Sequence, residues 1–110
     1  MNIYHIIPRT TWEQALAAGE YRAASLATEN FIHASTREQV ADTGNRYYRG
    51  QPNLALLVID TEKVQSEVRF EPVMLYGALT HFPHIYGPLN LDAVVEVLDF
   101  APDEQGNFHF

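Results

Sequence analysis

The feature that most limits the fold is an apolar run in the middle of the chain. Residues 54–59 are Leu-Ala-Leu-Leu-Val-Ile, and the first charged residue after them is Asp60. An alternating pattern would indicate a strand with one solvated face, whereas a short continuous run indicates a strand that is covered on both faces. The rest of the chain must therefore supply a sheet around this strand and packing layers on both sides of it.

The size and charge of the chain narrow the class of protein. It has 110 residues, of which 46% are hydrophobic, and this predicts a single domain over residues 1–110 with a polar C-terminal tail at about 101–110. The formal net charge is −7, and the seven Lys and Arg residues form no basic run. A nucleic-acid interface is disfavoured because it requires clustered cations.

Three features that the sequence lacks limit the possible chemistry of the protein and its expected location in the cell. The sequence has no cysteine, which excludes disulfides, thiolate catalysis and zinc–sulfur sites. Residues 1–7 lack the pattern of a secretory signal. No apolar run approaches the roughly 20 residues that a membrane helix needs. We therefore expect a soluble cytoplasmic protein, and the oligomeric state stays open.

Two helices are predicted near the N-terminus. Each has a capping-box pair at its start and a glycine suited to end it. These residues are Thr10, Glu13 and Gly19 for the first helix, and Ser35, Glu38 and Gly50 for the second. The second helix is expected to run from Ser35 to about Tyr48, with Tyr47 on its inner face.

Five or six strands complete the prediction, and most of them come later in the chain. The clearest are residues 1–7, 31–34, 53–60, 68–71 (closed by Pro72) and 94–100. The segment 21–30 has no clear period and is predicted to be a loop. The segment 80–88 is rich in Pro, His and aromatics and is predicted to be a structured loop. The summed pattern is an α+β fold.

Histidines on short strands are the first candidates for a site. His5 and His33 each share a strand face with apolar neighbours, and burying an imidazole is costly unless its nitrogens are hydrogen-bonded. Each could be a structural histidine or part of a site, and the pattern alone leaves both open.

A second candidate is the stretch Phe82-Pro83-His84-Ile85-Tyr86-Gly87-Pro88. Its prolines restrict the backbone on both sides of the histidine, and a rigid aromatic segment favours binding. The alternative is that it plugs the end of the core.

Glu71, between Phe70 and Pro72, is the one acid in an apolar setting, and its pKa is expected to be raised.

Several of these motifs occur together in one family. Tyr4-His5, Phe31-Ile32-His33-Ala34-Ser35-Thr36, Phe70-Glu71-Pro72 and the stretch 82–89 make the chain resemble the bacterial domain-of-unknown-function family 952. That family is distantly similar to the ADP-ribosyltransferase-like superfamily. His5 matches the superfamily's first-strand histidine, and Ile32-His33-Ala34-Ser35 is similar to the Val-His-Leu-Ser type motif of the RNA 2′-phosphotransferases.

The resemblance implies a fold, a ligand and roles for particular residues. The implied fold is ADP-ribosyltransferase-like, with two small packed β-sheets and two N-terminal helices. The implied ligand is NAD, ADP-ribose or a related nucleotide in a cleft between the sheets. The catalytic candidates are His33, Glu71 and His84. The ligand-binding candidates are His5, Phe31, Ser35, Phe82, Tyr86 and Gly87.

Two other hypotheses stay open. One is a non-catalytic module that binds a small molecule or a peptide in the same cleft. The other is a metal site made of histidines alone, because three imidazoles and a water form a known zinc arrangement. No zinc-protease spacing supports the metal site, so no residue is assigned as a metal ligand. Whether the protein is an enzyme is left open.

Overall fold

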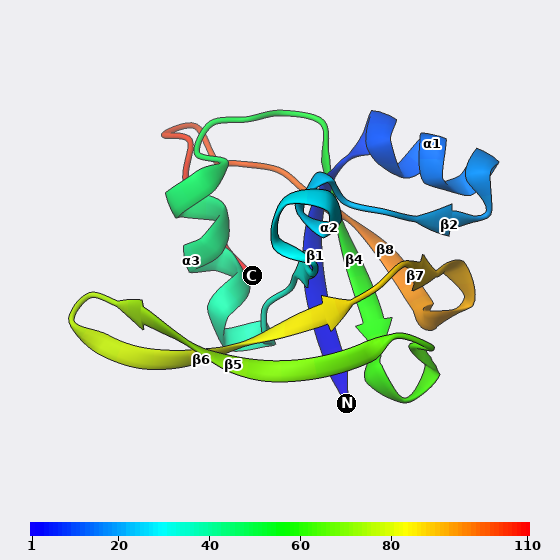
Figure 1. Ribbon diagram of the computed structural model, residues 1–110. Coiled ribbons are helices and arrows are strands. Elements are labelled where there is room, and N and C mark those ends of the chain that lie inside the picture. Colours follow the sequence, from blue (N-terminus) through cyan, green and yellow to red (C-terminus); the bar gives the residue numbers. More distant parts are fainter.

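A computed structural model describes all residues, 1–110. The protein has three α-helices and eight strands, and the strands form three small antiparallel sheets (Figure 1). The helices are α1 (Arg9–Ala18), α2 (Ala24–Glu29) and α3 (Arg37–Tyr47). The strands are β1 (Asn2–Pro8), β2 (Glu20–Tyr21), β3 (Ile32–His33), β4 (Leu54–Asp60), β5 (Glu67–Leu75), β6 (Ala78–Tyr86), β7 (Leu89–Asn90) and β8 (Val94–Phe100).

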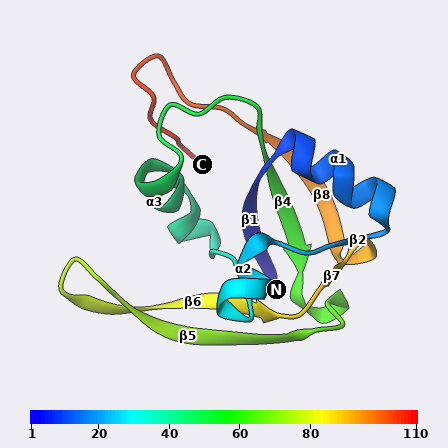
Figure 2. The ribbon, with the colours of Figure 1, turned by 45° about the horizontal axis from the view of Figure 1, so that its top comes forward.

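The central sheet has the order β1-β4-β8, with the apolar run in the middle strand. Six of the seven residues of β4 are buried, which confirms the prediction of a strand covered on both faces. On one face, Ile3 and Leu57 pack with Trp12 of α1; on the other, Ile6 and Leu56 pack with Val40 of α3. Figures 1 and 2 show α1 and α3 on opposite sides of this sheet.

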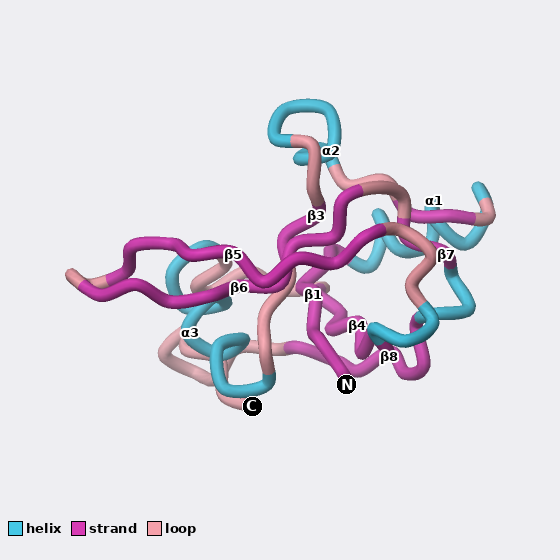
Figure 3. The backbone as a smooth tube through the Cα atoms, turned by 60° about the horizontal axis from the view of Figure 1, so that its bottom comes forward, coloured by secondary structure: helices cyan, strands magenta, loops and turns pink.

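The second sheet has the order β3-β6-β5, and the third is the short pair β2-β7. An isolated bridge between Tyr4 and Ser35 joins the first sheet to the segment after β3. The hairpin β5–β6 extends past α3 and away from the body of the molecule (Figures 1 and 3). The α+β class is confirmed, while the predicted two sheets and two helices are corrected to three of each.

The segment 21–30, predicted to be a loop, contains the second residue of β2 and all of α2. Helix α2 has only six residues and buries none of them. A helix this short with no buried stripe leaves no hydrophobic period to detect in the sequence.

The segment 80–88, also predicted to be a loop, is mostly strand β6. Pro83 is tolerated there because it takes part through its carbonyl oxygen, which accepts a hydrogen bond of 3.1 Å from the Ala34 N–H. Strand β5 likewise continues through Pro72, where the sequence predicted its end. It can do so because β5 is an edge strand, where proline is allowed.

Both predicted capping boxes are wrong in detail. Helix α1 begins at Arg9 with Pro8 as its N-cap, so Thr10 lies inside the helix. Helix α3 is capped by Thr36, whose N–H donates to Gln39 Oε1 at 2.9 Å. Gly19 ends α1 with φ +87°, as predicted. Helix α3 ends at Tyr47, so Gly50, with φ +75°, is not its stop.

The residues after β8 are tied back onto α3. Phe108 is 2% exposed and stacks on Phe100 with ring centroids 4.6 Å apart. The side chain of Asn45 bonds both the N–H and the C=O of Phe108. No helix in the structure combines the length and apolar character that crossing a membrane requires.

Candidate functional site: a histidine and aromatic cleft

A cleft of about 770 Å³ opens between the central sheet, α3 and the β5–β6 hairpin. Its lining residues come from β1, from the segment 21–35, from the second half of α3 and from the β5–β6 hairpin, and more than half of them are hydrophobic. Six of the nine predicted site residues line it: His5, Phe31, His33, Ser35, Phe82 and His84. Residues that are remote in sequence therefore meet in one concave site.

His5 on β1 is buried and uses both ring nitrogens. Its Nδ1 lies 2.5 Å from the His33 carbonyl oxygen, and its Nε2 lies 2.9 Å from the Tyr21 hydroxyl. Burial lowers the pKa of His5 to about 4, so the ring is neutral near pH 7. A carbonyl can only accept, so Nδ1 carries the proton, and Nε2 accepts from Tyr21. Burial also raises the pKa of Tyr21, which keeps this donor protonated.

His84 on β6 is held by Glu71 on β5. Its Nδ1 lies 2.8 Å from Glu71 Oε1, and the Tyr86 hydroxyl donates to the same oxygen. These bonds to Tyr86 and His84 lower the pKa of Glu71, which corrects the expected rise. Since an ionised carboxylate only accepts, Glu71 is an orienting acceptor at neutral pH and not a proton-donating acid.

Phe31 forms the flat wall of the cleft. Its ring stacks on His84 with centroids 3.9 Å apart and an interplanar angle of 16°. The His33 ring lies edge-on to both rings, with its centroid 4.8 Å from that of Phe31 and 5.6 Å from that of His84. His33 is itself bonded through Nε2 to Glu29 of α2 at 2.7 Å. The two imidazoles are thus adjacent, and each has a carboxylate partner.

Ser35 lines the cleft but does not cap a helix. It is 3% exposed, its backbone pairs with Tyr4, and its Oγ lies 3.2 Å from Thr43 Oγ1. Thr43 already donates to the Gln39 carbonyl, so the Ser35 hydroxyl is the donor to Thr43. The N-cap role predicted for Ser35 is wrong, because the helix begins one residue later.

The other three predicted residues do not line the cleft. The register of β5 and β6 pairs Arg69 with His84 and Glu71 with Phe82, which puts Glu71 on the same face as the cleft-lining side chains. Tyr86, two residues from His84, shares that face. Gly87 lies elsewhere: a Cβ there would meet Ser66 Oγ at 2.5 Å.

Tyrosines and one arginine are the main lining residues that sequence reasoning missed. They are Tyr4, Tyr21, Tyr47, Tyr48 and Arg46. Tyr47, predicted to face the core, is 70% exposed. Arg46 bonds Asp42 at 3.0 Å and lies over the Tyr47 ring. The sequence signals that could have pointed to them are the Tyr4-His5 motif and the run Arg46-Tyr47-Tyr48 at the end of α3.

Metal binding by histidines finds no support in this geometry. No group of three or more His, Asp or Glu side chains is arranged to hold a metal ion. His5 could join such a group only by giving up its bonds to the His33 carbonyl and to Tyr21.

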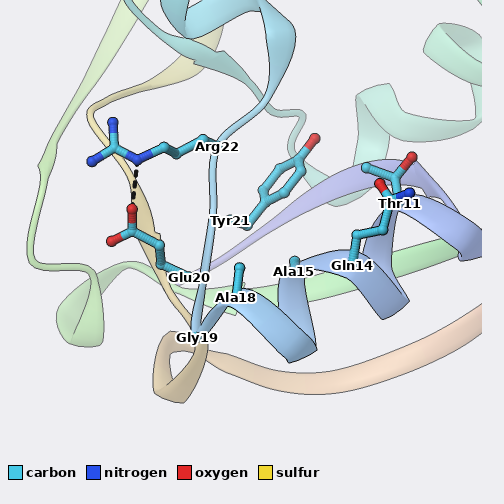
Figure 4. A pocket seen from close by; sticks show the side chains of 8 residues that line it. All are labelled: Thr11, Gln14, Ala15, Ala18, Gly19, Glu20, Tyr21 and Arg22. Atoms are coloured by element: carbon cyan, nitrogen blue, oxygen red, sulfur yellow. Dashed lines mark hydrogen bonds and ion pairs between the residues drawn. The ribbon is translucent and has the colours of Figure 1, made fainter.

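A second, smaller pocket of about 360 Å³ lies along α1 and β2 (Figure 4). Figure 4 shows the Glu20–Arg22 ion pair on one side of the strand and the Tyr21 ring on the other. Tyr21 lines both pockets, and its hydroxyl serves His5. We therefore centre the site on the larger cleft.

The fold and the cleft define a small α+β protein with a histidine and aromatic site. The chain belongs to the family described as protein of unknown function (DUF952), which matches residues 6–97. It is similar to the crystal structure of protein CC0527 from Caulobacter crescentus, with 33% identity and a TM-score of 0.86 over 99% of this chain and 94% of that one. The solution structure of CC0527 matches with 34% identity and a TM-score of 0.80 over 96% and 90% of the chains. No curated protein matches the chain.

Proposed function

We propose that this protein is a nucleotide-binding domain with an ADP-ribosyltransferase-like fold, whose cleft takes NAD, ADP-ribose or a related nucleotide. The observation that carries the proposal is the convergence of His5, Phe31, His33 and His84 on one cleft. A volume of about 770 Å³ falls within the range of about 300–1,000 Å³ that is usual for small-molecule sites.

The walls suit a ligand that carries a flat ring and several hydroxyls. Phe31 and His84 present a stacked aromatic surface, and such surfaces hold planar rings through offset stacking. Tyr21 donates its proton to His5, so its oxygen is left with acceptor capacity toward a ligand hydroxyl. A few oriented polar groups in a mostly apolar cleft are typical of ligand sites.

The resemblance to the ADP-ribosyltransferase-like superfamily supports the same ligand. His5 stands on the first strand, as the superfamily's histidine does, and His33 stands on a second strand that meets it. Glu71 is the candidate for the acidic residue of such enzymes, and it reaches the cleft through His84. Catalytic roles for His33, Glu71 and His84 are part of this proposal.

Calorimetric titration with NAD and with ADP-ribose tests the proposal. Phe31→Ala removes the stacking wall and is expected to weaken binding at least tenfold. Phe70→Ala is the matched control, because Phe70 is 41% exposed and lies on the face of the β5–β6 hairpin opposite to that of Phe82 and His84. Absence of heat at millimolar ligand, or equal effects of the two variants, would contradict nucleotide binding in this cleft.

The second candidate is a binding module without catalysis. It is favoured by the position of Glu71, which does not line the cleft and whose Oε1 already accepts from Tyr86 and His84. This candidate predicts that Glu71→Gln binds ligand as the wild type does, and that neither protein releases nicotinamide from NAD. Nicotinamide release by the wild type that disappears in Glu71→Gln would exclude it.

A further inference from the structure

One ring nitrogen of His84 has no partner in the protein. His84 is 5% exposed, its Nδ1 donates to Glu71, and Nε2 makes no hydrogen bond. Every fully buried side-chain nitrogen and oxygen in the structure has a hydrogen-bond partner. Because Nε2 of His84 has none, this atom is not fully buried, and it is accessible from the cleft that His84 lines. With Nδ1–H fixed on a carboxylate, the neutral ring offers a lone pair at Nε2.

His33 mirrors this arrangement. Its Nε2 is bonded to Glu29 and its Nδ1 has no partner. The two rings lie 5.6 Å apart at an interplanar angle of 78° and line the same cleft. Two adjacent imidazoles, each held by a carboxylate on one side, can supply a general base and a general acid to one ligand.

A cation lies on the strand that pairs with the strand of His84. Arg69 is directly opposite His84 in the β5–β6 register, and its guanidinium lies 4.5 Å from the centre of the Tyr86 ring. Its partner is Glu67, at 2.8 Å, and both side chains are about half exposed, so this ion pair is weak and open to exchange. Arg69 is not among the residues that line the cleft, but a guanidinium that exchanges Glu67 for phosphoryl oxygens can hold a group that extends past His84.

We propose that the cleft cleaves short ribonucleotide phosphodiesters, with His84 as general base and His33 as general acid. The proposal rests on the proposed function, since a nucleotide must occupy the same cleft. The absence of a basic run in a chain of net charge −7 points to a dinucleotide and not to a long polyanion.

The step balances without a further reactant. His84 Nε2 takes the proton of the ribose 2′-hydroxyl, and the bond from O2′ to phosphorus forms. The bond from phosphorus to the 5′ oxygen breaks with its electron pair on that oxygen, which takes a proton from protonated His33. The products are a 2′,3′-cyclic phosphate and a free 5′-hydroxyl, and Arg69 is the nearby cation available to the negative charge on the non-bridging phosphoryl oxygens. Solvent then restores the two histidines.

The test is cleavage of adenylyl-(3′→5′)-adenosine, followed by chromatography of adenosine and 2′,3′-cyclic AMP in the presence of EDTA. His84→Ala and His33→Ala are each expected to lower kcat at least 100-fold. His84→Phe is the second variant, because it keeps a ring against Phe31, and circular dichroism checks its fold. His81→Ala, an exposed histidine on the same strand, is expected to retain wild-type activity.

Glu71 is a positioning residue in this scheme, and its readout is the pH profile. Glu71→Gln is expected to lower kcat about tenfold and to displace the acidic limb of the kcat/KM profile. The groups that set this profile are Glu71 and Arg69 on β5, Tyr86 on β6, and the His33–Glu29 pair.

Four results would overturn the inference: a wild type no faster than His84→Ala prepared alongside it, loss of activity in EDTA, equal cleavage of the 2′-deoxy dinucleotide, or equal loss in His81→Ala. ADP-ribose binding without cleavage leaves the proposed function standing and removes this inference. Cleavage without ADP-ribose binding leaves this inference standing and restricts the proposed function to nucleotides other than NAD and ADP-ribose.

Discussion

The Nδ1 atom of His5 lies 2.5 Å from the carbonyl oxygen of His33. This bond joins β1 of the central sheet to β3 of the second sheet at the floor of the cleft, next to the Tyr4–Ser35 bridge. Because Nδ1 donates, the other nitrogen is left to accept from Tyr21. His5 therefore acts as a structural joint between the sheets, and it also orients the tyrosine hydroxyl.

His5 makes the fold sensitive to mild acid. Its pKa is about 4 in the fold and about 6.5 in the unfolded chain. A lowered histidine pKa gives stability that is complete above about pH 6.5 and is lost as the pH falls toward 4. Linkage predicts that this group lowers the free energy of unfolding by about 2 kcal/mol between pH 7.5 and pH 5. Urea unfolding of the wild type at the two pH values measures the loss.

The control for this prediction is His5→Asn, which keeps a donor near the His33 carbonyl but does not titrate. It is expected to be less stable at pH 7.5 and to lose little further stability at pH 5. Carboxylates with lowered pKa values, such as Glu71, act below this window and do not disturb the comparison. Equal pH dependence in the two proteins would show that His5 is not the acid-sensitive group.

Thr36 and Ser35 are neighbours, but only Thr36 caps a helix, so their substitutions should differ in their effect on stability. Thr36→Ala is expected to lower the free energy of unfolding by about 1 kcal/mol, since it removes the N-cap of α3. Ser35→Ala should have a smaller effect, because Thr43 keeps its own bond to the Gln39 carbonyl. Chemical denaturation of both variants checks the order, and a larger loss in Ser35→Ala would contradict the observed helix start.

The fold was predictable where one residue pattern dominated. The apolar run of β4 indicated a strand covered on both faces, and the structure agrees. Strand β6 was missed because Pro83 and the histidines suggested a loop, and only the pairing with β5 and β3 shows how a proline fits there. Helix α2 buries no residue, so no period could reveal it.

For the site, residue types were predictable and partners were not. His5, His33 and His84 stood out because buried imidazoles need partners, and they meet in the cleft. The partners Tyr21 and Glu29 came from a segment with no visible pattern. The pKa of Glu71 was expected to rise because its sequence neighbours are apolar. It falls because the β5–β6 register brings Tyr86 and His84 to it.

The turn of the β5–β6 hairpin carries conformational strain. Tyr76 and Gly77 have φ of +48° and +78°, the pattern of a type I′ turn, in which asparagine is preferred at the first position. Tyr76→Asn is therefore expected to stabilise the protein by up to about 1 kcal/mol. The gain is reduced by the loss of the exposed hydrogen bond that the Tyr76 hydroxyl donates to Asp42. Thermal unfolding measures the change.

The matched control is Tyr76→Val, which removes the same hydroxyl and puts a β-branched side chain at positive φ. It should destabilise the protein, because β-branched residues are the least tolerant of this conformation. Similar melting temperatures for the two variants would mean that the backbone conformation of Tyr76 is not what limits the hairpin.

Gly44 lets α3 pack against the C-terminal segment. A Cβ at this position would lie 2.9 Å from Phe100 Cε2 and 3.2 Å from Phe108 Cδ2, and these two rings are stacked on each other. Within a helix, Gly→Ala normally stabilises by about 1 kcal/mol. Here Gly44→Ala is expected to destabilise by about 1–3 kcal/mol, as overpacking does.

Glu38→Ala, an exposed change on the same helix, should have little effect. In Phe108→Ala the clash at Gly44 is partly relieved, so the cost of Gly44→Ala should shrink in that background. A cost that is unchanged there would place the steric conflict elsewhere than at the Phe100–Phe108 stack.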